Sequence, residues 1–399
     1  MGAGGHAARS RATTGLAFGY SLRYKVRRSA GCRWKQRIMS LEDLRSELTA
    51  IDRQIVELIA RRQQIVGDIG KSKHRSGRAT RDFEREKDVL DSAREYAGQM
   101  GVDPNLAEEI LTSLIRASLA YQEKSRVAAE AAGDGRRALI IGGAGKMGGW
   151  FVDYFSSQGF LTVIADTGVK AGPGRCRDWR QAGIDYDVIV VATPMAVSGQ
   201  ILKDLAELEP EGLIFDIGSL KSPLKEGLGA LRDAGCRVAS LHPMYGPDTE
   251  LLSGRHLIFI DVGCPEATVQ VKNLFSATMV EELDMGLEDH DRLIAYVLGL
   301  SHALNIAFFT ALAESGEAAP KLARLSSTTF DAQLLVSGAV ARDNPRMYFE
   351  IQNLNDFGMD PLDALCDSAA KIREVVASGD EDGFVKLMQK GREYLATRK

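Results

Sequence analysis

The stretch Ala138-Leu-Ile-Ile-Gly-Gly-Ala-Gly-Lys-Met-Gly148 decides the fold of the middle of this chain. A short apolar run leads directly into Gly143-x-Gly145-x-x-Gly148, a helix-like segment follows at residues 150–157, and a second apolar run ends in Asp166. In a dinucleotide-binding unit the first glycine allows a tight turn, the second lets the backbone approach the pyrophosphate, and the third lets the helix lie close to the strand. Because strand, glycine turn, helix and acid all occur in order, the stretch predicts such a unit.

The acid at the end of the second run indicates which dinucleotide binds. A carboxylate at Asp166 can accept a hydrogen bond from a ribose 2′-hydroxyl and would repel a 2′-phosphate, which favours NAD. Lys170 and Arg175 lie close by and keep NADP as an alternative. The residues predicted here to contact the cofactor are Gly143, Gly145, Lys146, Met147, Gly148 and Asp166.

Length and composition predict a soluble protein of two or three domains. The chain has 399 residues, 45% of them hydrophobic and 26% charged, and a net charge of −4 that gives no reason to expect nucleic acid or a membrane as partner. Its five cysteines include no Cys-x-x-Cys pair, so we expect a reducing, cytoplasmic location and no metal site. The most apolar run, residues 295–313, carries Ser301, His302 and Asn305 in its middle and is predicted to be a buried core helix.

The first 38 residues differ from the rest, with nine basic and no acidic side chains. That composition is typical of an organellar transit peptide, which would place the protein in an organelle. The alternative is a start codon placed too early, because Met39-Ser-Leu-Glu-Asp-Leu resembles a natural N-terminus. On either interpretation we expect residues 1–39 to lie outside the fold and to be disordered.

Residues 40–126 predict an all-α domain of three helices. Apolar residues recur by threes and fours from Leu41 to Ile69, which predicts a long amphipathic helix with a coiled-coil-like seam. A second helix is expected from about Asp82. Asp103-Pro104 supplies an N-cap and a proline at the first position of a third helix, which is expected to reach about Lys124.

Charged side chains can be placed on these helices. Arg62 and Lys73 share one face of the first helix, and Asp82 and Glu86 share one face of the second. Arg45 lies about 40 Å from Lys73 along a straight helix at 1.5 Å per residue. It can therefore serve only the site of a second subunit, which predicts an intertwined homodimer.

The polar positions of this segment resemble the all-helical chorismate mutase family. They are Leu44-Arg45, Ile51-Asp52, Ala60-Arg61-Arg62, Gly70-Lys71-x-Lys73, Arg81-Asp82-x-x-Arg85-Glu86 and Ser118-x-x-x-Gln122. The resemblance implies that Arg62, Arg85 and a second subunit's Arg45 hold the carboxylates of chorismate, with Ser118 contacting one of them. It further implies that Lys73 and Gln122 bond the ether oxygen, and that Asp82 and Glu86 position the ring hydroxyl. A pericyclic rearrangement needs such cations and donors but no nucleophile.

Residues 127–136 are small and polar and predict a linker, and residues 137–284 predict a doubly wound α/β domain of the Rossmann type. Further apolar runs occur at 187–192, 213–216, 237–241 and 256–260. Two strand ends matter most, because ligands bind at the carboxyl ends of such strands: Asp216-Ile-Gly-Ser-Leu-Lys221 and Leu241-His-Pro-Met-Tyr-Gly-Pro247. His242, at a strand end and followed by proline and glycine, is a candidate general base.

These motifs resemble the prephenate dehydrogenase family, and the chain from Met39 resembles the family in which that enzyme is fused to the mutase. The resemblance implies that His242 takes the proton of the C4 hydroxyl of prephenate while hydride passes to NAD and carbon dioxide leaves, giving 4-hydroxyphenylpyruvate. Ser219 and Lys221 match positions that orient His242 and substrate, and Thr193-Pro194 matches a loop against the cofactor.

Residues 285–399 predict an all-α domain and resemble that family's helical dimerisation domain, with His302 matching a histidine near the substrate. Bacterial members carry an arginine for the ring carboxylate where this chain has Ala339, and another family arginine falls on Asp331. Arg342, one helical turn further on, can present a guanidinium to the same pocket, and Arg346 less directly. Phe330, Gln333 and Tyr348 are further candidates to shape this pocket.

This departure leaves three functions open. The first is a bifunctional enzyme of tyrosine biosynthesis. The second is a mutase with a regulatory domain that senses NAD or tyrosine without hydride transfer, which Ala339 favours and His242 opposes. The third is a dehydrogenase for arogenate or 4-amino-4-deoxyprephenate. Tyrosine as a feedback ligand also stays open.

Overall fold

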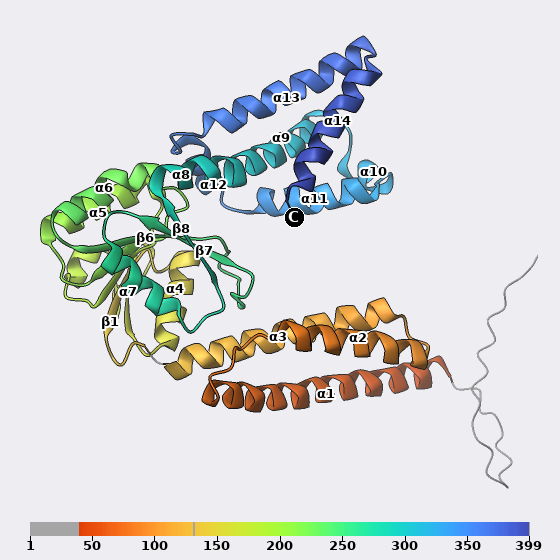
Figure 1. Ribbon diagram of the computed structural model, residues 1–399, viewed down its shortest axis with the longest axis horizontal. Coiled ribbons are helices and arrows are strands. Elements are labelled where there is room, and N and C mark those ends of the chain that lie inside the picture. The colour runs from red at the N-terminus through yellow and green to blue at the C-terminus, as the bar shows by residue number, and fades with distance from the viewer. Residues whose placement is uncertain (1–39, 131, 399) are drawn as a thin grey trace, which may run out of the picture. The chain divides into compact units, whose positions relative to one another are not determined.

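The computed structural model describes residues 40–130 and 132–398. The predicted transit-like extension at residues 1–39 lies outside these ranges. Figure 1 labels the helices and strands along the chain.

Three helices open the described chain, as predicted: α1 (Leu41–Arg75), α2 (Phe83–Met100) and α3 (Pro104–Glu130). The carboxylate of Asp82 caps α2 by accepting a hydrogen bond from Arg85 N, and Gly101, with φ 73°, ends it. Helix α3 continues past the predicted end at Lys124. Val127 is buried in the core of the following domain, so the first part of the predicted linker is helix.

The central domain contains one eight-stranded sheet in the order β3-β2-β1-β4-β5-β6-β7-β8. All pairs are parallel except β6 with β7. The strands are β1 (Arg137–Ile141), β2 (Leu161–Ala165), β3 (Arg175–Cys176), β4 (Val188–Val191), β5 (Leu213–Asp216), β6 (Arg237–Pro243), β7 (His256–Asp261) and β8 (Glu281–Gly286). The predictions omitted β3, which has two residues, and β8, whose acidic residues show no apolar run. Because β8 ends at Gly286, the predicted boundary after residue 284 divides a strand.

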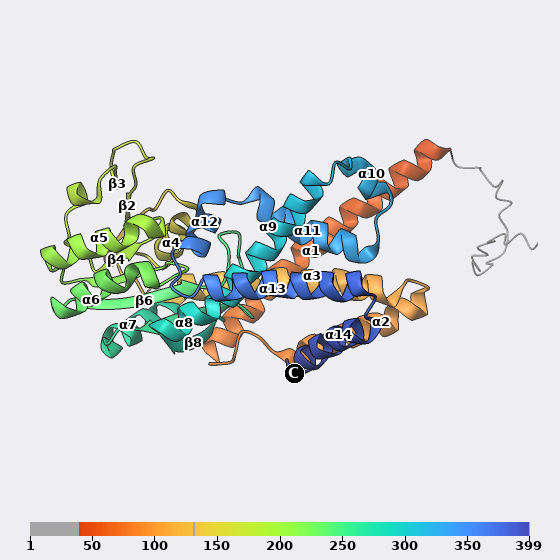
Figure 2. The same ribbon diagram turned by 90° about the horizontal axis from the view of Figure 1, so that it is seen from above.

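Helices cover both faces of this sheet (Figures 1 and 2). On one face, α4 (Lys146–Ser157) and α7 (Pro265–Phe275) bury an aromatic cluster that includes Phe151, Phe155 and Phe215. On the other, α5 (Met195–Leu208) and α6 (Lys225–Asp233) pack side by side over an aliphatic layer. Because the strands are buried on both faces, their sequences are continuous apolar runs. Ligands therefore bind at the carboxyl ends of the strands.

The last part of the chain is helical: α8 (Leu287–Ile294), a π-helical turn (Ala295–Leu300), α9 (Ser301–Glu314), α10 (Ala319–Arg324), α11 (Thr328–Arg342), α12 (Pro345–Asn353), α13 (Met359–Ser378) and α14 (Glu381–Ala396). Among the described residues, one stretch, Leu287–Glu314, is long and apolar enough to cross a membrane, and only 22% of its most apolar window is buried. The prediction of a buried core helix at residues 295–313 is therefore wrong for a single chain. Its apolar side chains are free to contact a second subunit.

Candidate active sites

The glycine loop follows β1, and two of its glycines are required by close approach. Gly142 has φ 87°, and a Cβ there would lie 2.4 Å from Ala192 O. A Cβ on Gly148 would lie 2.1 Å from Gly142 O. The tight turn was predicted at Gly143. The structure gives that role to Gly142, while Gly148 allows the close helix–strand packing that was predicted.

The residues around this loop fit NAD. Helix α4 begins at Lys146 behind Gly145, which has no side chain to cap it, so backbone N–H groups are left for an anion such as a pyrophosphate. Asp166, after β2, accepts hydrogen bonds from Ala144 N (3.1 Å) and Gly168 N (2.8 Å), which places its carboxylate beside the loop. Met147 packs partly buried against the core.

The loop after β4 lies at the same end of the sheet as the glycine loop. Pro194 precedes the first residue of α5, and Thr193 Oγ1 lies 2.8 Å from Ser198 Oγ. Glu350 on α12 accepts a hydrogen bond from Met195 N (3.0 Å), which ties the loop to the helical part.

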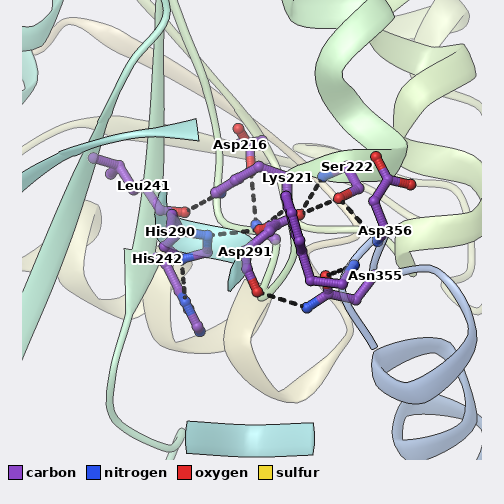
Figure 3. A network of polar contacts seen from close by, with 11 residues as sticks. Asp216, Lys221, Ser222, Leu241, His242, His290, Asp291, Asn355 and Asp356 are labelled. Atoms are coloured by element: carbon purple, nitrogen blue, oxygen red, sulfur yellow. Dashed lines mark hydrogen bonds and ion pairs between the residues drawn. The ribbon is translucent and has the colours of Figure 1, made fainter. Parts of the chain in front are cut away.

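His242 on β6 belongs to a buried chain of three side chains, which we call the histidine relay (Figure 3). His242 Nδ1 lies 2.9 Å from His290 Nε2, and His290 Nδ1 lies 2.7 Å from Asp291 Oδ1. Asp291 also accepts hydrogen bonds from Lys221 N (2.9 Å) and from the backbone and hydroxyl of Ser222. The sheet supplies the first member and the start of α8 supplies the other two.

The hydrogen bonds of the relay determine where its protons lie. Burial raises the pKa of Asp291, but the hydrogen bonds from His290 and Ser222 outweigh burial and lower it, so a carboxylate accepts the proton of His290 Nδ1. Burial lowers the pKa of His290, so its Nε2 is unprotonated and accepts from His242 Nδ1. His242 Nε2 is then left with a free lone pair. Burial, followed by His290 and Lys221, also holds the pKa of His242 well below its ordinary value, so it is a neutral base.

Lys221 does not contact this base directly. Its fully buried ammonium donates to Asp216 Oδ2 and to Leu241 O, both at 2.6 Å. Burial lowers the pKa of Lys221, and Asp216 opposes that change. Lys221 was predicted, from the family resemblance, to orient both His242 and substrate. The structure shows it bonding the backbone residue before His242 and lying outside the cavity.

A cavity of about 630 Å³ adjoins the relay. Its lining brings together four predicted residues, Ser219, His242, His302 and Arg342, with Lys146 of the glycine loop. A Cβ on Gly338 would lie 3.2 Å from Arg342 Nη1, so this guanidinium folds back over Gly338. The neighbouring Ala339 also lines the cavity. Lys146 Nζ lies 3.4 Å from Asp343 Oδ1.

The other predicted lining residues divide into two groups. Tyr348 lines the cavity and its ring centre lies 4.3 Å from that of His302. Burial lowers the pKa of His302, opposed by Asp343. Gln333 instead donates to Asn305 Oδ1 (3.0 Å), and Phe330 packs on Phe308, so neither lines this cavity.

The predicted mutase residues on α1 and α3 fall into two groups. Arg62 Nη1 donates to Ser118 Oγ and to Leu114 O (2.9 Å). Lys73 and Gln122 line a second cavity, of about 560 Å³. Lys73 Nζ donates to Thr80 O (2.8 Å), and the buried Gln122 Nε2 donates to Val66 O (3.3 Å), which leaves protons on both groups for a ligand.

The predicted residues at the start of α2 lie elsewhere. Asp82 accepts from Arg85 N (3.0 Å), and both oxygens of Glu86 accept from Arg81 (3.0 Å each). Glu86 lines a third cavity, of about 780 Å³. Of the predicted mutase residues, Lys73 and Gln122 line one cavity and Glu86 lines another, and the role of Arg45 in a partner's site stays a prediction.

Comparisons with known proteins assign these parts to families. Residues 44–123 match chorismate mutase type II, residues 165–278 match the nucleotide-binding domain of prephenate dehydrogenase, and residues 287–390 match its dimerisation domain. A chorismate mutase of Methanocaldococcus jannaschii is 32% identical over 87 residues, which are 22% of this chain and 88% of that protein. The chain belongs to the chorismate mutase family, and its mutase part is fused to a prephenate dehydrogenase.

Longer relatives agree with this fusion. The T-protein of Enterobacter agglomerans is 25% identical over 352 residues, covering 87% of this chain and 91% of that one. The structure of Aquifex aeolicus prephenate dehydrogenase with hydroxyphenyl propionate and NAD+ matches with a TM-score of 0.53 at 19% identity, covering 66% of this chain and 98% of that one. The chain is therefore an enzyme, an isomerase joined to an oxidoreductase with a nucleotide-binding domain, and the predicted three-part fold is confirmed.

Sequence reasoning missed three residues of the dehydrogenase site. Gly142 stands directly before the predicted glycine motif, and a glycine at a strand end is itself an indication of a turn. His290 and Asp291 lie in Glu288-Asp-His-Asp-Arg, where a histidine flanked by acids at a helix start could have suggested a base and its partner.

Proposed function

We propose that the helical part converts chorismate to prephenate, and that the rest of the chain converts prephenate to 4-hydroxyphenylpyruvate with NAD, on the route to tyrosine. The observation that carries the second step is the relay, in which His242 Nδ1 lies 2.9 Å from His290 Nε2 and His242 lines a cavity together with Arg342 and His302. A general base within reach of a bound hydroxyl is what the oxidation of an alcohol requires.

In this proposal His242 Nε2 removes the proton from the C4 hydroxyl of prephenate, and Ser219 orients that hydroxyl. Bound NAD supplies the nicotinamide that accepts the hydride. Arg342 takes the ring carboxylate, because a guanidinium pairs with a carboxylate through two parallel hydrogen bonds. The departing carboxylate leaves as carbon dioxide and its bonding electrons complete the aromatic ring. His302, held neutral by burial, contributes a hydrogen bond to the substrate.

The mutase reaction needs no base. Arg62, Arg85 and Arg45 of the partner subunit hold the two carboxylates, with Ser118 bonding the first of these arginines. Lys73 and Gln122 donate to the ether oxygen as its bond to carbon breaks, where charge develops. Asp82 and Glu86 position the ring hydroxyl. Protein groups thus fold the substrate into its reactive conformer.

The assembly is proposed to be a homodimer. The match to a dimerisation domain at residues 287–390 and the exposed apolar stretch Leu287–Glu314 support it. We propose the cytoplasm as the location, with an organelle as the alternative if residues 1–38 direct import. We also propose tyrosine as a feedback ligand of the dehydrogenase cavity, because it shares a hydroxyphenyl ring and a carboxylate with the product.

A mutase with a purely regulatory dinucleotide domain is the second candidate, and Ala339 is the observation that favours it. A sensor, however, has no use for a buried relay that fixes the proton of a base. Arogenate and 4-amino-4-deoxyprephenate remain alternative substrates of the same cavity.

The test is a coupled assay on protein starting at Met39. Chorismate consumption and NADH formation from prephenate, arogenate and 4-amino-4-deoxyprephenate are followed in parallel, with His242→Asn as the variant. We expect NADH from prephenate, lost in His242→Asn, while chorismate is still consumed. Chorismate consumption without NADH from any substrate would leave the regulatory candidate.

A further inference from the structure

The loop at residues 248–255 continues the strand that carries His242, yet it contacts the mutase helices. Thr249 O accepts from Trp150 Nε1 (3.1 Å), which holds the start of the loop on α4. Near its end, Leu252 N donates to Glu123 Oε2 (2.7 Å) on α3. The other oxygen of Glu123 accepts from Met279 N, so one buried carboxylate bonds two backbone segments of the dehydrogenase.

The next residue, Ser253, contacts Arg81, which directly precedes the N-cap of α2. Arg81 Nη1 donates to Ser253 Oγ (2.8 Å), while Arg81 Nε and Nη2 donate to the two oxygens of Glu86. The guanidinium also lies 4.3 Å from the centre of the Phe83 ring. Three contacts therefore fix the plane of this guanidinium, and that plane fixes the Glu86 carboxylate through a two-bond pair.

The third cavity is lined by both parts of the chain. Arg81 and Glu86 line it together with α3 and with residues 248–255. The side of Glu86 that faces this cavity is therefore shaped by residues of the dehydrogenase.

We propose that Ser253 is a positioning residue for the mutase reaction, acting on Glu86 through Arg81. The inference rests on the proposed role of Glu86 in holding the ring hydroxyl. It makes the fusion of the two enzymes functional, because a loop of the second enzyme orders a substrate contact of the first.

The test uses the full chain and the variants Ser253→Ala and Ser253→Thr, with Ser113→Ala as matched control. Ser113 lines the same cavity but makes no hydrogen bond to Arg81 within the described residues. We expect Ser253→Ala to lower kcat/KM for chorismate roughly threefold to tenfold, mainly through KM, because one charge-assisted hydrogen bond that orders a binding group is lost. Ser253→Thr keeps the hydroxyl and should restore the wild-type value.

Dehydrogenation of prephenate should be unchanged in all three variants, which confirms that each is folded. Equal kcat/KM for chorismate in wild type, Ser253→Ala and Ser113→Ala would overturn the inference, as would a threonine variant as impaired as the alanine variant. Failure of the wild type itself to consume chorismate is a different result. It would refute the proposed mutase function, and the inference with it.

Discussion

Replacing Asp291 by asparagine tests the relay most directly, because it changes one atom and leaves the shape of the side chain. The carboxylate accepts from the backbone of Lys221 and Ser222 and from His290. An amide has one acceptor oxygen, which stays with the backbone donors, so its NH₂ group faces His290 Nδ1. His290 must then carry its proton on Nε2, and His242 must carry its proton on the nitrogen that faces the cavity.

Restoring the productive arrangement in this variant breaks one hydrogen bond, either Asn–His290 or His290–His242, because the other can still form. The loss costs about 1 to 1.5 kcal/mol, since two buried donors are left facing one another. That corresponds to a kcat roughly 5- to 13-fold lower at 1.36 kcal/mol per decade.

The assay is steady-state NADH formation from prephenate at saturating NAD, with chorismate consumption by the same sample as the control for folding. The Asp291→Asn variant should keep its mutase rate. A dehydrogenase kcat within about threefold of wild type would refute the derived proton positions, since that loss is smaller than one hydrogen bond accounts for.

Three further predictions concern the same half of the molecule. Arg342→Ala should raise KM for prephenate about 10- to 100-fold by removing a charge-assisted bond. Arg346→Ala, at the start of α12 and outside the cavity, should not, and steady-state kinetics of both variants decide this. Because burial lowers the pKa of His242, dehydrogenase activity should persist as the pH falls below the ordinary histidine value and be lost only through the lowered pKa. The stability gained from neutral His242 is lost in the same acidic range. The measurement is a pH profile of the dehydrogenase rate with mutase activity as reference. A dehydrogenase rate that already fell near the ordinary histidine pKa would contradict the prediction. Gly148→Ala places a Cβ 2.1 Å from Gly142 O and should weaken NAD binding roughly 5- to 150-fold, because overpacking costs about 1–3 kcal/mol. Gly149→Ala, whose Cβ would lie 3.9 Å from its nearest neighbour, should bind NAD in calorimetry as wild type does.

The sequence predicted those elements whose cause is local. Strand β5 was placed at residues 213–216, as found, because its apolar run is bounded by turn residues on both sides. The start of α2 followed from the cap at Asp82. Strand β8 has no such local cause. It forms because β7 offers an edge to pair with, and its charged residues face solvent there.

The candidate site divides in the same way. His242 was predicted because a strand end is visible in the sequence, but its partners come from the start of α8, 48 positions later in the chain. Only the sheet order, with β8 beside β7 and β7 beside β6, brings His290 to that strand end. The burial that makes Lys221 a structural contact is likewise a property of the folded sheet.

The substitution at Ala339 shows how one helix can keep a charge at a pocket while its sequence changes. Arg342 lies three positions later on α11, on the same face, and its side chain is long enough to reach back by one turn. It can do so because Gly338 has no side chain: a Cβ there would lie 3.2 Å from Arg342 Nη1, tighter than ordinary contact. A large residue at position 339 would occupy the same part of the cavity lining. Gly338, Ala339 and Arg342 therefore form one arrangement. Its two small residues make room for the guanidinium, which we propose binds the ring carboxylate.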